Sequence, residues 1–375
     1  MTKMTHFKYL LTTLLVAVTA IAATAQKLQV VDTDGQPVAF VAVTSDSGTL
    51  IGTTDTEGWL ADARGAATLH LSHVAYKSKT VALADVADGK ITIEELSFDL
   101  PEVTVKPKEL AYVQTYFRLV YVNDDGPVYY RAGVIDNTYE IATKKVKAHT
   151  RSLSRGRSGF IRFLLSTLIG RYIDRWGQLQ PQTYYKKIKD YALKGDLTLS
   201  EEPSGRVVVS DTVARLGYID TDLTGGQRTT AFNAVAFRRH KEQAEEQAKR
   251  EAAIAAGKKV KEKKRKQRND DEENNFYEVY RIDQDGNSAI TDFVMRQFQT
   301  QGTSERSGNK YTIILESYAT DRNYIDKKDY KQLRKDNEVD MEHEELLRFE
   351  QAHHIPPLPA NLQEQVDRLF QKDKK

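Results

Sequence analysis

Residues 30–59 decide the fold of the first part of the chain, and they read VVDTDGQPVAFVAVTSDSGTLIGTTDTEGW. Short runs of β-branched and apolar residues alternate here with turns that contain Asp and Gly. The pattern continues in residues 69–81, LHLSHVAYKSKTV, and in residues 100–105, LPEVTV. Short strands at close spacing, with no helical period, are typical of an all-β sandwich. We therefore predict a β-sandwich over residues 27–105, in which residues 38–43 form a strand that is buried on both faces.

An ordered set of motifs runs through this stretch: D-x-x-G-x-P-V, T-D-x-x-G, L-x-L-S-x-V-x-Y-K and a closing L-x-E-V-x-V. The residues that carry it are Asp32, Gly35, Pro37, Thr54, Asp55, Gly58, Leu69, Leu71, Ser72, Tyr76, Leu100, Pro101, Glu102 and Val103. The set resembles the carboxypeptidase regulatory-like domain, although Ala75 stands where many members have glycine. The resemblance implies a transthyretin-like β-sandwich and an exported protein of a Gram-negative envelope. It implies no chemistry.

Residues 1–25 have the pattern of a secretory signal peptide. Two lysines precede an apolar run from Tyr9 to about Ala22, and Ala23-Thr24-Ala25 is a small-x-small cleavage site. The uninterrupted apolar core is shorter than the roughly 20 residues that a membrane-spanning helix needs. We expect cleavage after Ala25, export to the periplasm or to the outer membrane as an associated protein, and no transmembrane span in the mature chain.

Composition limits the remaining possibilities. The sequence contains no cysteine, so it offers neither a disulfide nor a cysteine for lipid attachment. Loss of two lysines with residues 1–25 would leave 53 Lys and Arg against 53 Asp and Glu. A neutral mature chain gives no reason to expect a polyanion over its whole surface, and we expect no nucleic-acid partner.

Residues 111–325 predict an α+β domain with an antiparallel sheet and one or two packed helices. Residues 112–122 and 128–141 are aromatic, β-branched runs joined by an Asp-Gly turn, which indicates a hairpin. Residues 151–159, RSLSRGRSG, are interpreted as a basic loop. Residues 160–176 carry apolar side chains at helical spacing. That helix would lie on the sheet as part of the core or, alternatively, at the envelope surface.

More strand-like runs follow this helix, at residues 205–210, 229–237, 276–282, 289–298 and 311–318. The sequence DQDGN at 283–287 predicts a second hairpin turn. Residues 326–375 predict a helical tail, with helices at 327–335, 339–352 and 361–370 and a break at IPPLP, residues 355–359. A concave sheet wrapped round a helix is one form that this domain could take.

Residues 238–273 form a charged insertion between two strand-like runs. Residues 238–268 hold 13 Lys and Arg against 5 Glu. The first half is rich in Ala, Glu, Gln and Lys and is expected to be helical. The run is interpreted as a solvated excursion, with binding to an anionic lipid or lipopolysaccharide surface as the alternative. Deletion of residues 241–275 is expected to leave the fold intact.

No catalytic, cofactor-binding or metal-binding residue is assigned, and no cofactor is expected. No histidine has Glu three residues later, as a zinc carboxypeptidase requires, and the 270 residues after Val105 are too few for a plug and a transporter barrel. The pair His353-His354 has no metal-ligand spacing, and GRSG at 156–159 lacks the final glycine of a nucleophile turn. Nucleotide-binding motifs are missing as well.

Weaker candidates remain among acids and tyrosines. The acid pairs Asp136 with Glu140 and Glu278 with Asp292 could meet in space, which would suit a hydrolase. Tyrosines at 112–139 and 184–191, with Arg118 and Arg131, could line a glycan or peptide groove, although sheet packing explains them more simply.

The leading hypothesis is a non-enzymatic envelope protein that binds another envelope protein, a glycan or a lipid surface. Its sandwich would serve as an attachment or spacer module. The alternatives are a carrier that holds an apolar ligand in a concave sheet and a hydrolase with an unrecognised acidic site. A closed apolar cavity would favour the carrier, and two carboxylates that meet in a cleft would favour the enzyme.

Overall fold

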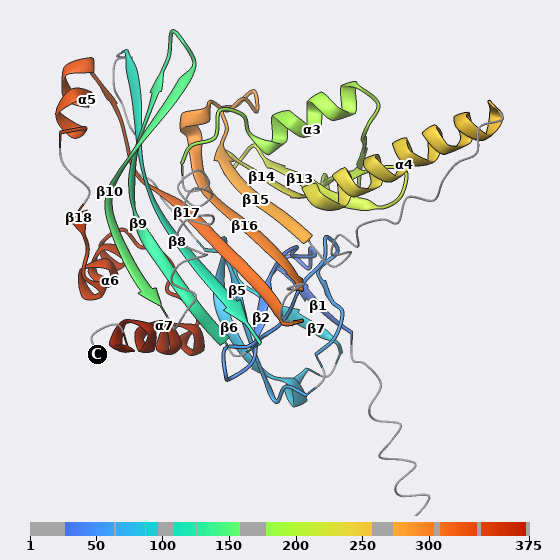
Figure 1. Cartoon of the computed structure of the whole chain (residues 1–375), viewed down its shortest axis with the longest axis horizontal. Helices are drawn as coiled ribbons and strands as arrows, with labels where there is room; N and C mark the ends of the chain where they lie inside the picture. The colour runs from blue at the N-terminus through green and yellow to red at the C-terminus, as the bar shows by residue number, and fades with distance from the viewer. Residues whose placement is uncertain are drawn as a thin grey trace, which may run out of the picture.

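The computed structural model describes residues 27–63, 65–86, 88–96, 109–124, 126–157, 178–256, 273–303, 308–335 and 339–372. The chain is β-rich, with antiparallel strands and helices grouped at a few places (Figure 1). This agrees with the predicted combination of a β-rich front part, an antiparallel sheet and helices. The predicted signal peptide, the helix expected at 160–176 and the segment 97–108 lie outside the described residues.

The front part consists of two small sheets. One has the order β4-β1-β7, with β4 Trp59–Leu60, β1 Leu28–Val31 and β7 Lys90–Thr92. The other has the order β3-β2-β5-β6, with β3 Leu50–Thr53, β2 Ala42–Thr44, β5 Thr68–His73 and β6 Tyr76–Ala82. A short 3-10 helix, η1 Leu83–Asp85, follows β6. Both sheets contribute to one apolar cluster that includes Leu28, Val30, Val43, Leu69 and Leu71. We call residues 27–96 the sandwich unit.

The predicted strand over residues 38–43 is wrong for residues 38–41, because strand β2 begins only at Ala42. Phe40 has a φ of 63°, in the left-handed region that bulky residues avoid. The buried Thr54 hydroxyl donates to the carbonyl of Val38 at 2.9 Å and accepts from the amide of Val41 at 2.9 Å. These bonds satisfy a bend in the backbone, and the bend turns Phe40 out of the sandwich toward the rest of the molecule.

The rest of the chain forms a large sheet of order β11-β12-β13-β14-β15-β16-β17-β8-β9-β10-β18. All of its pairings are antiparallel except the one between β10 and β18. The strands are β8 Leu110–Asn123, β9 Gly126–Glu140, β10 Lys145–Arg157, β11 Thr198–Glu201, β12 Val207–Ser210, β13 Arg215–Asp222, β14 Gln227–Asn233, β15 Glu273–Arg281, β16 Phe293–Thr303, β17 Lys310–Ile325 and β18 Val339–Asp340. Both predicted hairpins, β8–β9 and β15–β16, are confirmed.

Three predictions for this region were wrong in detail. Residues 151–157 belong to strand β10 rather than to a loop, because they pair with β9 along its length. These residues are polar because β10 lies close to the edge of the sheet, where its outer neighbour is the two-residue strand β18. Their polar character therefore suggested a loop. The run 229–237 ends as a strand at Asn233, whose side chain caps helix α4 by accepting from the amide of Ala236 at 2.9 Å. The run 289–298 opens with a 3-10 turn, η3 Ile290–Asp292, before β16.

The helices are α3 Tyr184–Leu193, α4 Ala234–Ala255, α5 Lys327–Leu333, α6 His343–Ala352 and α7 Ala360–Lys372. Helices α5 and α7 agree with the predicted tail, whereas the predicted helix at 339–352 begins only after strand β18. Figure 1 places α3 and α4 over the β13–β15 part of the sheet, and α6 and α7 beside β9 and β10. None of the helices in the described ranges combines the length and apolar character that crossing a membrane requires.

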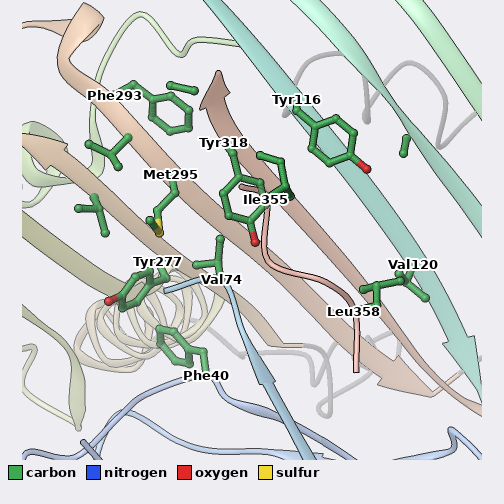
Figure 2. Packing of buried hydrophobic residues seen from close by; sticks show 14 of the residues in the cluster. Phe40, Val74, Tyr116, Val120, Tyr277, Phe293, Met295, Tyr318, Ile355 and Leu358 are labelled. Carbon is green, nitrogen blue, oxygen red and sulfur yellow. The ribbon is translucent and has the colours of Figure 1, made fainter. Parts of the chain in front are cut away.

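One apolar cluster joins the sandwich unit, the large sheet and the C-terminal segment 343–372. Phe40 and Val74 come from the sandwich unit, and Ile355 and Leu358 come from the segment that joins α6 to α7. Figure 2 shows these side chains converging on sheet residues such as Tyr318. Each of the five is at most 7% exposed. Burying side chains of this size stabilises the fold by roughly 1.5–3 kcal/mol each, so the three parts share one core.

Polar contacts fix how the parts sit on one another. Gln297 on β16 accepts from the amide of Val74 at 3.1 Å and donates to the carbonyl of Phe40 at 2.9 Å. Asn361 on α7 donates to the hydroxyl of Thr44 and to the carbonyl of Ser45, both at 2.9 Å. A sandwich held on both sides in this way does not serve as a freely moving spacer.

Candidate functional site

The first predicted acid pair, Asp136 and Glu140, is divided between different partners on strand β9. Asp136 is buried and accepts from the Tyr112 hydroxyl at 2.6 Å and from the Arg151 guanidinium at 2.9 Å. Glu140 lies near the end of the strand and accepts from the Thr143 hydroxyl at 2.6 Å, which lowers the pKa of Glu140. The described contacts therefore give each acid a structural role.

The second pair, Glu278 and Asp292, is also divided. Glu278 is 1% exposed, contacts Arg296 at 3.4 Å and accepts from the backbone amide of Tyr184 at the start of α3. Burial raises the pKa of Glu278, while Arg296 and the amides at the start of α3 act in the opposite direction. Asp292 accepts from the amide of Ala289 at 2.6 Å and so closes the η3 turn. Glu278 thus fastens helix α3 to the sheet, and Asp292 shapes a turn.

A third buried set of charges was missed by the sequence reasoning. Arg118 on β8 donates to Glu316 on β17 at 2.5 Å and to the carbonyl of Pro356 at 2.6 Å, and it lies 3.7 Å from Glu350 on α6. Burial lowers the pKa of Arg118, but Glu316, Tyr318 and Glu350 raise it more, so the guanidinium stays charged. The partners of Arg118 lie 198 to 238 positions away in the sequence, which is why no local motif reveals the set.

This third set brings two carboxylates close to one guanidinium, but not in a cleft. Glu316 is 3% exposed and Glu350 is 5% exposed, and neither lines the two cavities described below. Glu350 also accepts from the hydroxyl of Tyr116. The set therefore ties α6 and the Pro356 segment to the sheet.

The predicted tyrosine groove is explained by sheet packing. Tyr116 and Tyr130 are at most 2% exposed and lie in the shared core, while Arg118 and Arg131 are buried as well. Tyr184 on α3 stacks on Phe276 with ring centres 4.1 Å apart.

Two further sequence candidates are the His353-His354 pair and the GRSG sequence at 156–159. The His353 ring packs against Phe349 at 4.1 Å. Gly156 lies in strand β10, whereas residues 158 and 159 of the GRSG sequence lie outside the described ranges.

The charged insertion leaves the sheet as helix α4 and returns as strand β15. Helix α4 confirms the helical expectation for the first half, while residues 257–272 lie outside the described ranges. Residues 241–252 are all exposed, and Figure 1 shows α4 pointing away from the sheet. Because Asn233 pairs with Asn275, the insertion begins and ends on neighbouring strands.

Two cavities open on the surface of the described residues. The first has a volume of about 350 Å³ and lies where Leu50 and Ile51 of the sandwich unit meet the ends of β8, β16 and β17. The second has a volume of about 420 Å³ and lies between the turn end of the β9–β10 hairpin and helix α5. The second is the candidate functional site, because charged side chains dominate its lining.

We call this second cavity the basic pocket. Its lining residues are Leu110, Thr138, Glu140, Lys145, Lys147, Lys327, Tyr330, Lys331, Arg334 and Lys335. Six of them are cationic and one is acidic. No local motif marks the pocket, because its two groups of cations lie about 180 positions apart and each group is short.

Comparison with known proteins adds no identity. No protein-family model matches the chain, and no curated protein matches its sequence.

Proposed function

We propose that the chain is an exported, non-enzymatic binding protein of a Gram-negative envelope. Residues 1–25 support export, since they combine a basic start, an apolar run and a small-x-small site. In this proposal the protein acts in the periplasm or in association with the outer membrane.

The sandwich unit supports the proposed relation to carboxypeptidase regulatory-like domains. Its short strands form two sheets around one apolar cluster, as a transthyretin-like sandwich would. The motif residues Asp32 and Asp55 also have turn roles, since each accepts from two backbone amides in its own turn. These are structural uses, in keeping with a domain that serves attachment rather than catalysis.

The observation that carries the proposal is that the buried acidic residues hold the fold together. Asp136, Glu278, Glu316 and Glu350 are each held by structural partners and are at most 5% exposed. An acid that acts on a substrate must reach it, and these are occupied in holding strands and helices together. An exposed pocket lined by cations is, by contrast, suited to holding a ligand.

The carrier alternative receives less support. One face of the large sheet is filled by Phe40 and Val74 from the sandwich unit and by Ile355, Leu358 and Leu362 from the C-terminal segment. An apolar ligand on that face would have to displace these residues.

A retention experiment tests the proposal. The mature chain, immobilised, is exposed to separated envelope phospholipid, lipopolysaccharide, peptidoglycan fragments and envelope proteins, and the bound fraction is analysed by mass spectrometry. We expect one class to be retained and released unchanged. Release of a chemically altered component, in amounts exceeding the immobilised protein, would contradict the non-enzymatic role.

A further inference from the structure

The basic pocket is built by segments from two distant parts of the chain. Strand β10 contributes Lys145 and Lys147, and the α5 region contributes Lys327, Lys331 and the residues that follow the helix. Figure 1 shows α5 at the end of the strands β8 to β10 that is remote from α7. The tertiary fold therefore brings these cations together.

The spacing of the cations along each element places their side chains on one side of that element. Lys145 and Lys147 are two positions apart on a strand, so their side chains share a face. Lys327 and Lys331 are four positions apart on a helix and lie on one side of it. Lys328, on the same helix, does not line the pocket.

Acidic partners neutralise only part of this charge. Lys327 lies 3.7 Å from Glu109 and 3.6 Å from Glu140, and these contacts join α5 to the end of β9. Within the described ranges, Lys145, Lys331 and Lys335 have neither an ion pair nor a side-chain hydrogen bond. The pocket thus keeps an excess of positive charge in the free protein.

The Tyr330 ring and a buried floor give the pocket a fixed shape. The ammonium of Lys147 lies 5.7 Å from the centre of the Tyr330 ring, and the guanidinium of Arg334 lies 5.9 Å from it. Both distances are in the range of a cation–π contact, which restrains the two side chains. Leu110 and Thr138 are at most 5% exposed and form the floor.

The ordinary reasons for surface lysines do not account for this arrangement. Cations near the end of a helix stabilise its negative pole, which explains Arg334 and Lys335. That effect gives no reason for Lys145 and Lys147 to face them from another element. Like charges gathered at one cavity repel each other, and a bound anion would remove the repulsion.

We propose that the basic pocket binds a phosphate-bearing ligand with two or more negative charges. A phosphate monoester carries a charge of about −1.5 to −2 and has three strong acceptor oxygens. Its tetrahedral oxygens accept from point donors in several directions, which suits a group of lysines. A planar carboxylate is matched best by a two-pronged arginine, and only Arg334 is available here. The inference deepens the proposed binding role. It rests on that role in one respect, namely that the bound ligand is not chemically altered.

Titration calorimetry with the full mature chain tests the proposal, with inorganic pyrophosphate as the probe. We expect saturable binding that weakens severalfold between 50 and 300 mM salt, because exposed charges are screened. Lys331→Gln should weaken binding at least threefold, and Lys145→Gln combined with Lys331→Gln at least tenfold. Lys328→Gln removes the same charge from the same helix outside the pocket and should change binding less than twofold.

A second arm distinguishes a free phosphate compound from a lipid headgroup. Sedimentation with vesicles of phosphatidic acid, whose headgroup is a phosphate monoester, in phosphatidylcholine that depends on Lys331 but not on Lys328 would identify a headgroup as the source. Binding of pyrophosphate without sedimentation would identify a free compound.

Three results would overturn the inference. They are the failure of both probes to bind, equal losses in Lys331→Gln and Lys328→Gln, and binding that is insensitive to salt. Release of orthophosphate from pyrophosphate would instead contradict the non-enzymatic role while leaving the pocket as the binding site.

Discussion

At the scale of single residues, a few polar side chains determine how the apolar parts meet. Gln297 is 1% exposed and serves two backbone groups of the sandwich unit at once. One of them is the carbonyl of Phe40, whose left-handed backbone costs of order 1–3 kcal/mol. The surrounding contacts offset that strain, because they turn the Phe40 ring into the shared core.

His73 makes stability depend on pH. Its ring is buried between Tyr76 and Tyr277, and its Nδ1 accepts from the amide of Ala75 at 3.2 Å. Burial lowers the pKa of His73 from 6.5 to about 3. Below pH 6.5 the unfolded chain therefore binds a proton that the folded chain does not, so stability is lost as the pH falls toward 3.

We expect His73→Phe to remove this dependence, since phenylalanine keeps an aromatic ring but does not titrate. The variant should be less stable than the parent at pH 7. The difference in unfolding free energy between the parent and His73→Phe should decrease as the pH falls from 6 to 4.5, by roughly 1 kcal/mol per pH unit. Urea denaturation at several pH values measures it.

Tyr277→Phe is the matched control for His73→Phe. It removes a buried hydroxyl from the ring that packs on His73 and leaves the histidine in place. It should lower stability and keep the pH slope of the parent. A constant gap between His73→Phe and the parent across this range would show that His73 does not titrate as described.

At the scale of elements, the charged insertion is separable from the sheet, but not at the boundaries expected from sequence. Asn275 is 2% exposed and lies in strand β15, so a deletion of residues 241–275 would remove the start of that strand. Val235 and Phe237, in the first turn of α4, are buried too. The removable part lies between these two anchors.

Replacing residues 243–271 with a short glycine-containing turn should therefore leave the fold intact. Because all but one of the deleted helical residues are exposed, we expect the melting temperature to change by less than about 2 °C. Deletion of residues 241–275 is the comparison and should lower it several times more. Differential scanning fluorimetry suffices, and an equal drop in both variants would show that α4 supports the sheet.

Elements with a local signal could be predicted from the sequence, and elements defined by distant partners could not. The hairpin of β15 and β16 has its Asp-Gly turn, where Gly286 takes a φ of 73°. Strand β10 has a polar, basic sequence, and tertiary contacts rather than local preference decide its pairing with β9. The bend at Phe40 depends on the side chain of Thr54, fourteen residues later. The cations of the basic pocket lie farther apart still, and no periodicity connects them.

At the scale of the whole molecule, the shared core predicts cooperative unfolding. Phe40 belongs to the sandwich unit but is buried against the large sheet and the C-terminal segment. We expect one calorimetric transition for the mature chain, with equal calorimetric and van't Hoff enthalpies. Phe40→Ala should cost about 3–5 kcal/mol and split the transition in two, because it weakens the junction between the parts.

Phe232→Ala provides the comparison for the junction. Phe232 is 1% exposed and lies in the separate cluster under α3 and α4. Its loss should lower stability by a similar amount without splitting the transition. Two transitions in the parent chain would contradict the shared core.

The position of the C-terminal segment has a consequence for how the protein is made. A ribosome produces residues 343–372 after the sandwich unit and the whole large sheet, yet Ile355, Leu358 and Leu362 complete the core that both depend on. Until that segment has emerged, the sheet face that carries Tyr116 and Arg118 lacks its cover. The order of synthesis thus delays closure of the fold, and a chain that is exported as we propose would remain open during transit and close after its final helices had crossed.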